Sequence, residues 1–299
     1  MTVERDVARI FDRAQVTGWL HVTDIDGGAE VAVGADTPVA LASVFKLVVL
    51  VALAREADAG ALDLRERVAV PAASRTPGVT GLAALRDDAE LSLRDLAQLM
   101  ITVSDNAAAD AVVDRLGWPA VAATVEALGL RHTAVSQACR DLHAALAADL
   151  ARTGLTLPQA LGDPAALAGL TVLDPATTNR STPRDMTALL GAVWRDEAAS
   201  PRACAAMRGV LALQVWPHRL ASGFPSDDVA VAGKTGTLPP LRSEVGVVER
   251  PDGRRYAAAV FTRSRGRALT DPAADAAIGA AARAAVDALG GAGAPLRRV

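Results

Sequence analysis

Two polar residues interrupt an otherwise apolar stretch near the start of the chain, "ALASVFKLVVL" at residues 40–50. Ser43 and Lys46 are three residues apart, so on a helix they share one face. A lysine is almost never buried without a partner. A serine hydroxyl becomes a nucleophile when a base takes its proton, and an amine with a lowered pKa can be that base. We therefore interpret Lys46 as the functional partner of a nucleophilic Ser43.

Two further polar motifs follow in chain order. They are Ser104-Asp105-Asn106, within "ITVSDNAAAD", and Lys234-Thr235-Gly236, within "VAGKTGTL". Taken singly, the three motifs also fit a helix end, a helix cap, and a strand edge with its turn. Their order, and the strand-turn context of the third, favour one site. S-x-x-K, S-D-N and K-T-G together are the signature of class A β-lactamases and penicillin-binding proteins.

The chain resembles these penicillin-recognising serine hydrolases, and class A β-lactamases in particular. The resemblance extends over most of the chain, including "LSLRDLAQLMITVSDNAAADAVVDRLG" and "STPRDMTALL". It implies an acyl-enzyme on Ser43 with Lys46 as the base. It also implies that Ser104 relays a proton to the leaving nitrogen. Asn106 would hold the substrate amide and orient Lys46.

The resemblance assigns the third motif to substrate binding. Lys234 would supply positive potential to Ser104 and to a substrate carboxylate, and Thr235 would donate a hydrogen bond to that carboxylate. Gly236 would let the substrate lie against the strand without a side chain in the way. Backbone N–H groups of Ser43 and Thr237 would form the oxyanion hole.

A nearby arginine is also expected to bind the substrate carboxylate. Arg242, in "LPPLRSEVGVV", is the first candidate and Arg219 the second. An exposed Arg242 beside Glu244 is an equally good interpretation of the pattern. Glu244 is predicted to pair with one of these arginines, or to narrow the substrate pocket.

The resemblance fails between about residues 136 and 179. Class A enzymes carry an E-x-x-L-N signature soon after the second motif, and its glutamate activates the water that hydrolyses the acyl-enzyme. Here no glutamate occurs between Glu126 and Glu197. The stretch "CRDLHAALAADLA" predicts an additional helix instead. Asp141 and His143 are the nearest candidates for the deacylating base.

Composition limits the partners. A net charge of −3 and 3% aromatic residues argue against nucleic-acid binding. No apolar run is long enough to span a membrane. Cys139 and Cys204 define neither a disulfide framework nor a metal site, and two free thiols are favoured over a bridge. We expect no cofactor and no metal, a small-molecule substrate with a carboxylate, and a monomer. No secretory signal is visible, so the chain as written is expected to be cytoplasmic, or secreted if a leader was trimmed.

Elements at both chain ends are predicted to build one sheet. "GWLHVTDID" and "AEVAVGAD" flank Gly27-Gly28 and predict a hairpin. "DVAVAGKTG" and "EVGVVERPDGRRYAAAVFT" predict strands, and a helix capped near Asp271 closes the chain. The fold class is therefore α+β: an antiparallel sheet from both chain ends, covered by helices, plus a mostly helical lobe, with the active site in the cleft between them. We expect one catalytic domain over 1–299, its α/β lobe at about 1–42 and 210–299 and its helical lobe at about 43–209.

The predicted function is that of a serine hydrolase that opens a β-lactam or a related amide through an acyl-serine intermediate. Three alternatives stay open. The same site would also suit a D-amino-acid amidase or peptidase, or an esterase. The missing glutamate favours a slow penicillin-binding acyl-trap.

Overall fold

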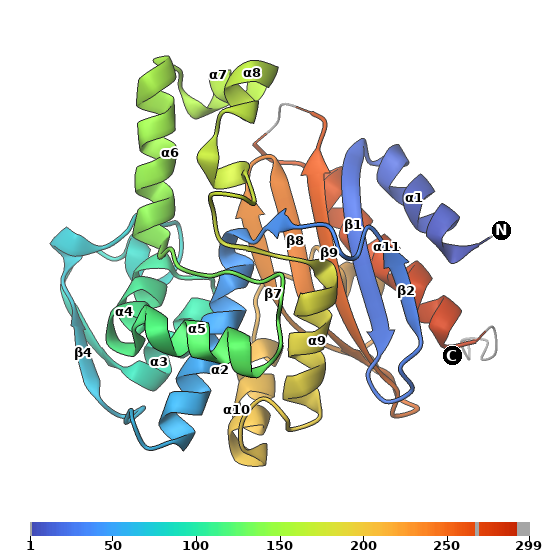
Figure 1. Ribbon diagram of the computed structural model, residues 1–299, viewed down its shortest axis with the longest axis horizontal. Coiled ribbons are helices and arrows are strands. Elements are labelled where there is room, and N and C mark those ends of the chain that lie inside the picture. The colour runs from blue at the N-terminus through green and yellow to red at the C-terminus, as the bar shows by residue number, and fades with distance from the viewer. Residues whose placement is uncertain (1, 267–268, 292–299) are drawn as a thin grey trace.

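A five-stranded antiparallel sheet is the centre of the computed structural model, which describes residues 2–266 and 269–291. Its order is β2-β1-β9-β8-β7 (Figure 1). The strands are β1 (Val16–Asp24), β2 (Glu30–Val33), β7 (Ala230–Leu238), β8 (Leu241–Glu249) and β9 (Arg255–Ser264). The first and last strands of the chain meet where β1 pairs with β9 along its whole length. The sheet is therefore built from both chain ends, as the sequence predicted.

Helices cover both faces of this sheet, and strand β9 shows why. Successive side chains of a strand point to opposite faces. Tyr256, Ala258 and Val260 pack in the core formed with α1 (Val3–Arg13) and α11 (Pro272–Leu289). Ala257, Ala259 and Phe261 pack in the core on the opposite face, with α2 (Phe45–Asp58), α9 (Pro183–Trp194) and α10 (Pro201–Ala212). A strand covered on both faces is apolar throughout, which explains the run "YAAAVF".

Helix α2 is the central, buried helix of the helical lobe. Every residue from Phe45 to Leu53 is buried, in keeping with a helix that is apolar on all sides. A short 3₁₀ turn, η1 (Ala42–Val44), leads into it and carries Ser43. Packed around α2 are α3 (Leu93–Thr102), α4 (Asn106–Leu116) and α5 (Trp118–Ala127).

The remaining elements are short, apart from α6, which the sequence predicted. They are β3 (Val39–Ala40), β4 (Arg67–Val70), η2 (Ala72–Ser74), η3 (Gly81–Ala84), β5 (Ala89–Ser92), α6 (Cys139–Thr153), α7 (Leu157–Gly162), α8 (Pro164–Ala168), η4 (Thr171–Leu173), β6 (Arg180–Ser181) and η5 (Leu220–Gly223). The β4–β5 and β3–β6 pairs were not predicted, because strands of two to four residues carry too little alternation to recognise.

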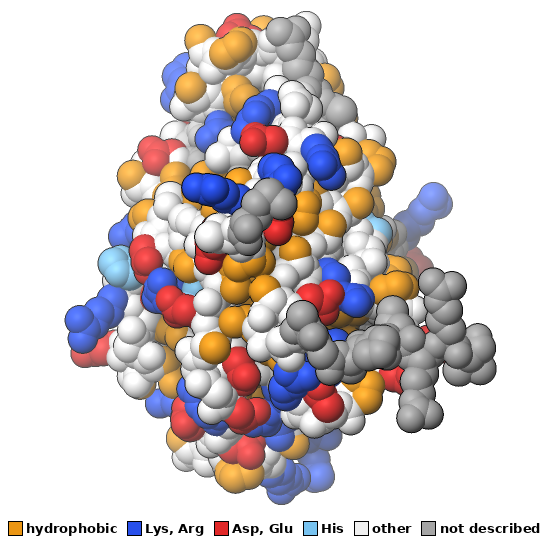
Figure 2. All heavy atoms as spheres, turned by 90° about the vertical axis from the view of Figure 1, so that its right-hand side faces the viewer, with side chains coloured by type: hydrophobic (Ala, Val, Ile, Leu, Met, Phe, Trp, Pro, Cys, Tyr) orange, Lys and Arg blue, Asp and Glu red, His pale blue; other side chains and the backbone are white. Residues whose placement is uncertain are grey.

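The surface over α1 and α11 mixes charges of both signs. Figure 2 shows this face, with lysine and arginine side chains interspersed among aspartate and glutamate. Within the described residues, no helix is long and apolar enough to cross a membrane.

Asp105, in the middle of the second motif, has a structural role. Its buried side chain is the N-cap of α4, where Oδ1 accepts hydrogen bonds from the N–H groups of Ala107 and Ala108 at 3.0 and 3.2 Å. Its Oδ2 accepts the N–H of Leu82 in η3, directly after the segment 77–80 that borders the cavity described below. One carboxylate thus joins the first turn of α4 to Leu82 in η3.

Replacing Asp105 by alanine should destabilise the fold far more than an ordinary cap loss. A lost N-cap costs about 1 kcal/mol, and each buried N–H group left without a partner costs about 1–3 kcal/mol more. We expect a loss of roughly 3–5 kcal/mol in the free energy of unfolding, measured by urea denaturation. The control is Ser92→Ala, which removes the more exposed cap of α3 and should cost only about 1 kcal/mol. Equal losses in the two variants would contradict this role for Asp105.

Candidate active site

All three sequence motifs meet at one cavity of about 630 Å³. The residues that line it are Ser43, Pro77, Gly78, Val79, Thr80, Val103, Ser104, Asn106, His143, Trp216, His218, Arg219, Thr235 and Thr237. This lining contains no aspartate or glutamate. A smaller cavity of about 270 Å³, between β4 and α4, contains none of the motif residues.

Lys46 is fully buried and held by the second motif. Its Nζ donates to the backbone oxygen of Ser104 at 2.6 Å, to Ser104 Oγ at 3.3 Å, and to Asn106 Oδ1 at 2.9 Å. Burial lowers the pKa of Lys46, although Cys139, Asp105 and Asp110 oppose the shift. The lowered pKa that the sequence analysis required of a lysine base is thus accounted for by burial.

Lys234 approaches the same hydroxyl from the other side. Its Nζ donates to Ser104 Oγ at 2.9 Å and to the backbone oxygen of Thr235 at 2.7 Å. The side chain is fully buried, and its pKa lies well below the ordinary value because of burial and the positive charges of Lys46 and Arg219. Ser104 Oγ is therefore within hydrogen-bonding distance of both lysines.

The backbone is strained beside both serines. Ala42, directly before Ser43, has φ +45°, and Ser104 itself has φ +59°. Residues other than glycine avoid this left-handed region, and each such residue costs about 1–3 kcal/mol. Packing around the site holds Ala42 and Ser104 in these conformations, and both Ser43 and Ser104 line the cavity.

Gly236 is required for a different reason from the one predicted. A Cβ at this position would lie 2.5 Å from Ser243 Oγ, 2.8 Å from the backbone oxygen of Leu41 and 3.0 Å from Val44. These atoms belong to the protein interior rather than to the space for substrate. The glycine lets β7 pack closely against the turn that carries Ser43.

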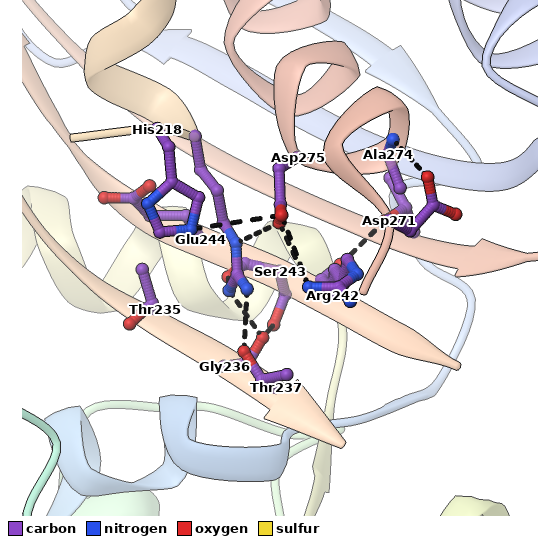
Figure 3. Close-up of polar contacts among 12 residues, drawn as sticks. His218, Thr235, Gly236, Thr237, Arg242, Ser243, Glu244, Asp271, Ala274 and Asp275 are labelled. Atoms are coloured by element: carbon purple, nitrogen blue, oxygen red, sulfur yellow. Dashed lines mark hydrogen bonds and ion pairs between the residues drawn. The ribbon is translucent and has the colours of Figure 1, made fainter. Parts of the chain in front are cut away.

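Arg219, and not Arg242, borders the cavity. Arg219 donates to Thr237 Oγ1 at 2.7 Å and to the backbone oxygens of Gly236 and Ser243. Its Nε donates to Asp275 of α11 at 2.6 Å. Arg242 is buried behind the strand, where it meets Asp275 (Figure 3). It also donates to the backbone oxygen of Leu269. The placement of Arg242 as either the carboxylate-binding residue or an exposed arginine was therefore wrong.

Glu244 does not pair with either arginine. It lies opposite Thr235 on β8, is 1% exposed, and accepts hydrogen bonds from Gln214 Nε2 at 2.6 Å and from the N–H of Leu220 at 2.7 Å. Gln214 in turn accepts the N–H of Thr235 at 2.7 Å. Glu244 thus positions Thr235 of the third motif through Gln214. Gln214 was not predicted, because it lies in no recognisable sequence motif.

Of the two candidates for a deacylating base, His143 lines the cavity and Asp141 does not. Asp141 accepts the N–H of Ala138 at the start of α6 and is absent from the cavity lining. Its predicted role has no support in this placement. His143 does line the cavity, and its Nε2 is 3.4 Å from Asn106 Nδ2. Asn106 Nδ2 also donates to the backbone oxygen of Pro77 at 2.9 Å.

The comparison with known proteins agrees with this geometry. A family model described as the β-lactamase enzyme family matches residues 2–289. The β-lactamase regulatory protein BlaB of Streptomyces cacaoi is 33% identical over 295 residues, which cover 93% of this chain and 95% of that protein. The chain belongs to the β-lactamase enzyme family.

Two solved structures illustrate the shared fold. A β-lactamase from Sphaerobacter thermophilus has a TM-score of 0.76 and 29% sequence identity, over 95% of this chain and 97% of that one. PBP-A has a TM-score of 0.75 and 24% identity, over 94% of this chain and 93% of that one, and this likeness concerns the fold alone. In this β-lactamase family member, the described residues include no cluster of histidine, cysteine, aspartate or glutamate able to hold a metal ion.

Glu244→Gln should change how the stability of the protein depends on pH. Burial raises the pKa of Glu244 from 4.5 to about 7. The folded state therefore binds this proton more tightly than the unfolded state. The resulting stabilisation is complete below pH 4.5 and is lost as the pH rises through 7. Between pH 5 and 8, the wild type should lose about 2–3 kcal/mol relative to the variant.

Urea denaturation at both pH values measures this difference. Glutamine has the size of glutamate and can still accept the N–H of Leu220. Glu126→Gln, at an exposed position on α5, is the matched control and should show no such pH-dependent difference. A constant offset between wild type and Glu244→Gln across this range would contradict the prediction.

Proposed function

We propose that this protein opens a β-lactam, or a related amide, by forming an acyl-enzyme on Ser43. One observation carries the proposal: two buried lysines share the hydroxyl of Ser104 beside the cavity that Ser43 lines. Such an arrangement has a direct use in acyl transfer. One amine can accept a proton while the hydroxyl between the lysines delivers one.

In the proposed acylation step, neutral Lys46 takes the proton of Ser43 Oγ, which bonds to the carbonyl carbon of the substrate. Backbone N–H groups of Ser43 and Thr237 stabilise the resulting oxyanion. The C–N bond then breaks, and Ser104 gives its proton to the leaving nitrogen. The protonated Lys46, which donates to Ser104 Oγ, returns a proton to that hydroxyl. Lys234 contributes positive potential throughout.

The substrate is proposed to carry a carboxylate. Arg219 and the hydroxyls of Thr235 and Thr237 offer donors at one end of the cavity. Arg219 is 3% exposed and already neutralised in part by Asp275, so it contributes a local dipole and hydrogen-bond donors as well as charge. A small molecule with one carboxylate fits this arrangement.

A second candidate is a penicillin-binding regulator that stays acylated. The curated relative from Streptomyces cacaoi is named a β-lactamase regulatory protein. The cavity lining here has no carboxylate to activate water for deacylation. Both candidates begin with the same acylation of Ser43, and they differ only in how long the adduct lives.

Ser43→Ala should abolish covalent labelling by a penicillin, because loss of the nucleophile removes several orders of magnitude of rate. Intact mass spectrometry after incubation with benzylpenicillin measures the adduct. Ser74→Ala, a change at an exposed serine outside the cavity, is the control and should label like the wild type.

The time course of the same experiment separates the two candidates. A hydrolase loses the adduct and consumes a chromogenic cephalosporin repeatedly, whereas a regulator gives one stoichiometric burst. Full labelling of the Ser43→Ala protein would overturn the proposal in both forms.

Lys46→Arg should remove most of the acylation rate, because a guanidinium keeps its proton at working pH. In the wild type, the acylation rate should rise with pH and level off above the lowered pKa of Lys46, since only the neutral amine accepts a proton. Stopped-flow measurement with a chromogenic cephalosporin provides the profile. If the larger arginine prevents folding, Lys46→Met makes the same test. An active variant with an unchanged profile would show that another group is the base.

A further inference from the structure

The cavity of about 270 Å³ between β4 and α4 has no role in the chemistry proposed above. Strand β4, the segment 71–76 and helix α4 line it, together with Arg140 of α6. Its volume is close to the lower limit of about 300 Å³ for ligand pockets, so it suits a small molecule. The charges and the apolar side chains of its wall indicate which kind.

Arg75 brings to this cavity a positive charge that carbonyl groups alone hold in place. Its guanidinium group donates to the backbone oxygens of Val70, Leu82, Leu85 and Asp87. These bonds use all five of its N–H groups. Across residues 2–266 and 269–291, the structure gives this guanidinium no carboxylate partner. Its charge therefore remains available to attract an anion.

Arg115 offers the hydrogen bonds that Arg75 cannot. Its Nε donates to Glu66 Oε1 at 2.6 Å, and in the described part of the chain its two terminal nitrogens have no partner. A guanidinium binds a carboxylate best through two parallel N–H groups. Arg140, by contrast, already donates through both of its terminal nitrogens to Asp114. Arg115 is thus the arginine of this cavity that is able to bind a carboxylate.

Apolar side chains form another part of the wall. Val68 and Val70 of β4, and Ala107 and Ala111 of α4, line the cavity beside the arginines. An inorganic anion would leave these side chains without contacts, whereas a carboxylate on an apolar body would use both kinds of wall. The cavity therefore fits a small organic carboxylate.

This cavity shares three walls with the active site. The segment 71–76 continues into the segment 77–80, which borders the active-site cavity, and α4 and α6 also line both cavities. In each wall, residues close in sequence face the two cavities: Thr76 and Pro77, Ala107 and Asn106, and Arg140 and His143. A ligand in one cavity therefore contacts the elements that form the other.

Asp110 of α4 joins the three walls. It is 5% exposed, and its Oδ1 accepts the N–H of Cys139 at 2.7 Å. Its Oδ2 accepts the N–H of Arg140 at 3.1 Å and the hydroxyl of Thr76. One buried carboxylate thus connects α4 both to the start of α6 and to the segment before Pro77. A ligand that fixes this part of α4 also fixes its two neighbours.

We propose that this cavity is a binding site for a small organic carboxylate, with Arg115 as its main donor, and that the bound anion speeds the acylation of Ser43. The binding stands on the cavity alone, and the effect on acylation rests on the proposed function. The anion bridges Arg115 of α4 and Arg75 of the segment before Pro77, and so holds that side of the active-site cavity in one arrangement. A preorganised wall lowers the cost of binding a substrate.

Benzoate is the probe for binding, and benzamide, which has the same ring without the charge, is its control. In a titration followed by NMR, benzoate should shift the methyl signals of Ala107 and Ala111 saturably, and benzamide should not. Arg115→Gln should weaken benzoate binding at least about tenfold, as expected for a lost charge-assisted hydrogen bond. Glu66→Gln removes the same surface ion pair but keeps the guanidinium, so it should bind benzoate at least as tightly as the wild type.

Acylation by benzylpenicillin, followed by intact mass spectrometry, tests the effect on Ser43. Saturating benzoate should raise the acylation rate of the wild type at least about fivefold, the lower limit of ordinary coupling between two sites. Arg115→Gln should be acylated at the wild-type rate without benzoate and should not respond to the same concentration of it. Glu66→Gln should respond like the wild type. Circular dichroism establishes that each variant is folded.

Benzoate also carries the group that the active site is proposed to bind, and the NMR titration separates the two places. Shifts confined to Thr235 and Thr237, or equal binding by the wild type and Arg115→Gln, overturn the new site. Binding at Ala107 with an unchanged or lower acylation rate overturns the effect on acylation and leaves the site intact. A folded wild type that benzylpenicillin never labels overturns the proposed function, and the benzoate titration is then still a complete test of the site.

Discussion

Two buried lysines that share one hydroxyl are the constraint on which this active site depends. Lys46 and Lys234 are both fully buried, and both donate to Ser104 Oγ. Two like charges buried side by side oppose each other, so burial and mutual repulsion both favour a neutral amine. The surrounding polar groups are mostly acceptors, among them the backbone oxygens of Ser104 and Thr235. Burial, rather than an added negative charge, therefore lowers the pKa values of both amines.

The two faces of the sheet at strand β7 hold different charged groups. Lys234 and Gly236 point toward the helices, where the amine meets Ser104 and the missing side chain admits the turn before Ser43. The opposite face of the sheet holds Arg242 and Asp275 (Figure 3), and Asp275 also pairs with Arg219. One carboxylate there contacts two guanidinium groups, which fixes Arg219 at the edge of the cavity. Arg219, at the edge of the cavity, is thus held by α11 through Asp275.

The sequence was informative where function is carried by short local motifs. Ser43, Lys46, Ser104 and Lys234 could be found because each lies in a motif a few residues long, and the structure brings them together. Arg219 could not be preferred over Arg242, because both are buried on the same side of the sheet and only the turn before η5 brings one to the cavity. The sheet and α6 were predicted, since long periodic segments are the most recognisable.

The pairing of β1 with β9 has a consequence for synthesis. Val16 lies opposite Ser264, so the first strand cannot find its partner until nearly the whole polypeptide has left the ribosome. Ser43, Ser104 and His143 all emerge long before β7 brings Lys234. Contacts so distant along the chain form slowly and leave partly built states exposed. A nascent chain would therefore hold Lys46 without its second lysine, and the pair of amines around Ser104 would be completed only in the final stage of folding.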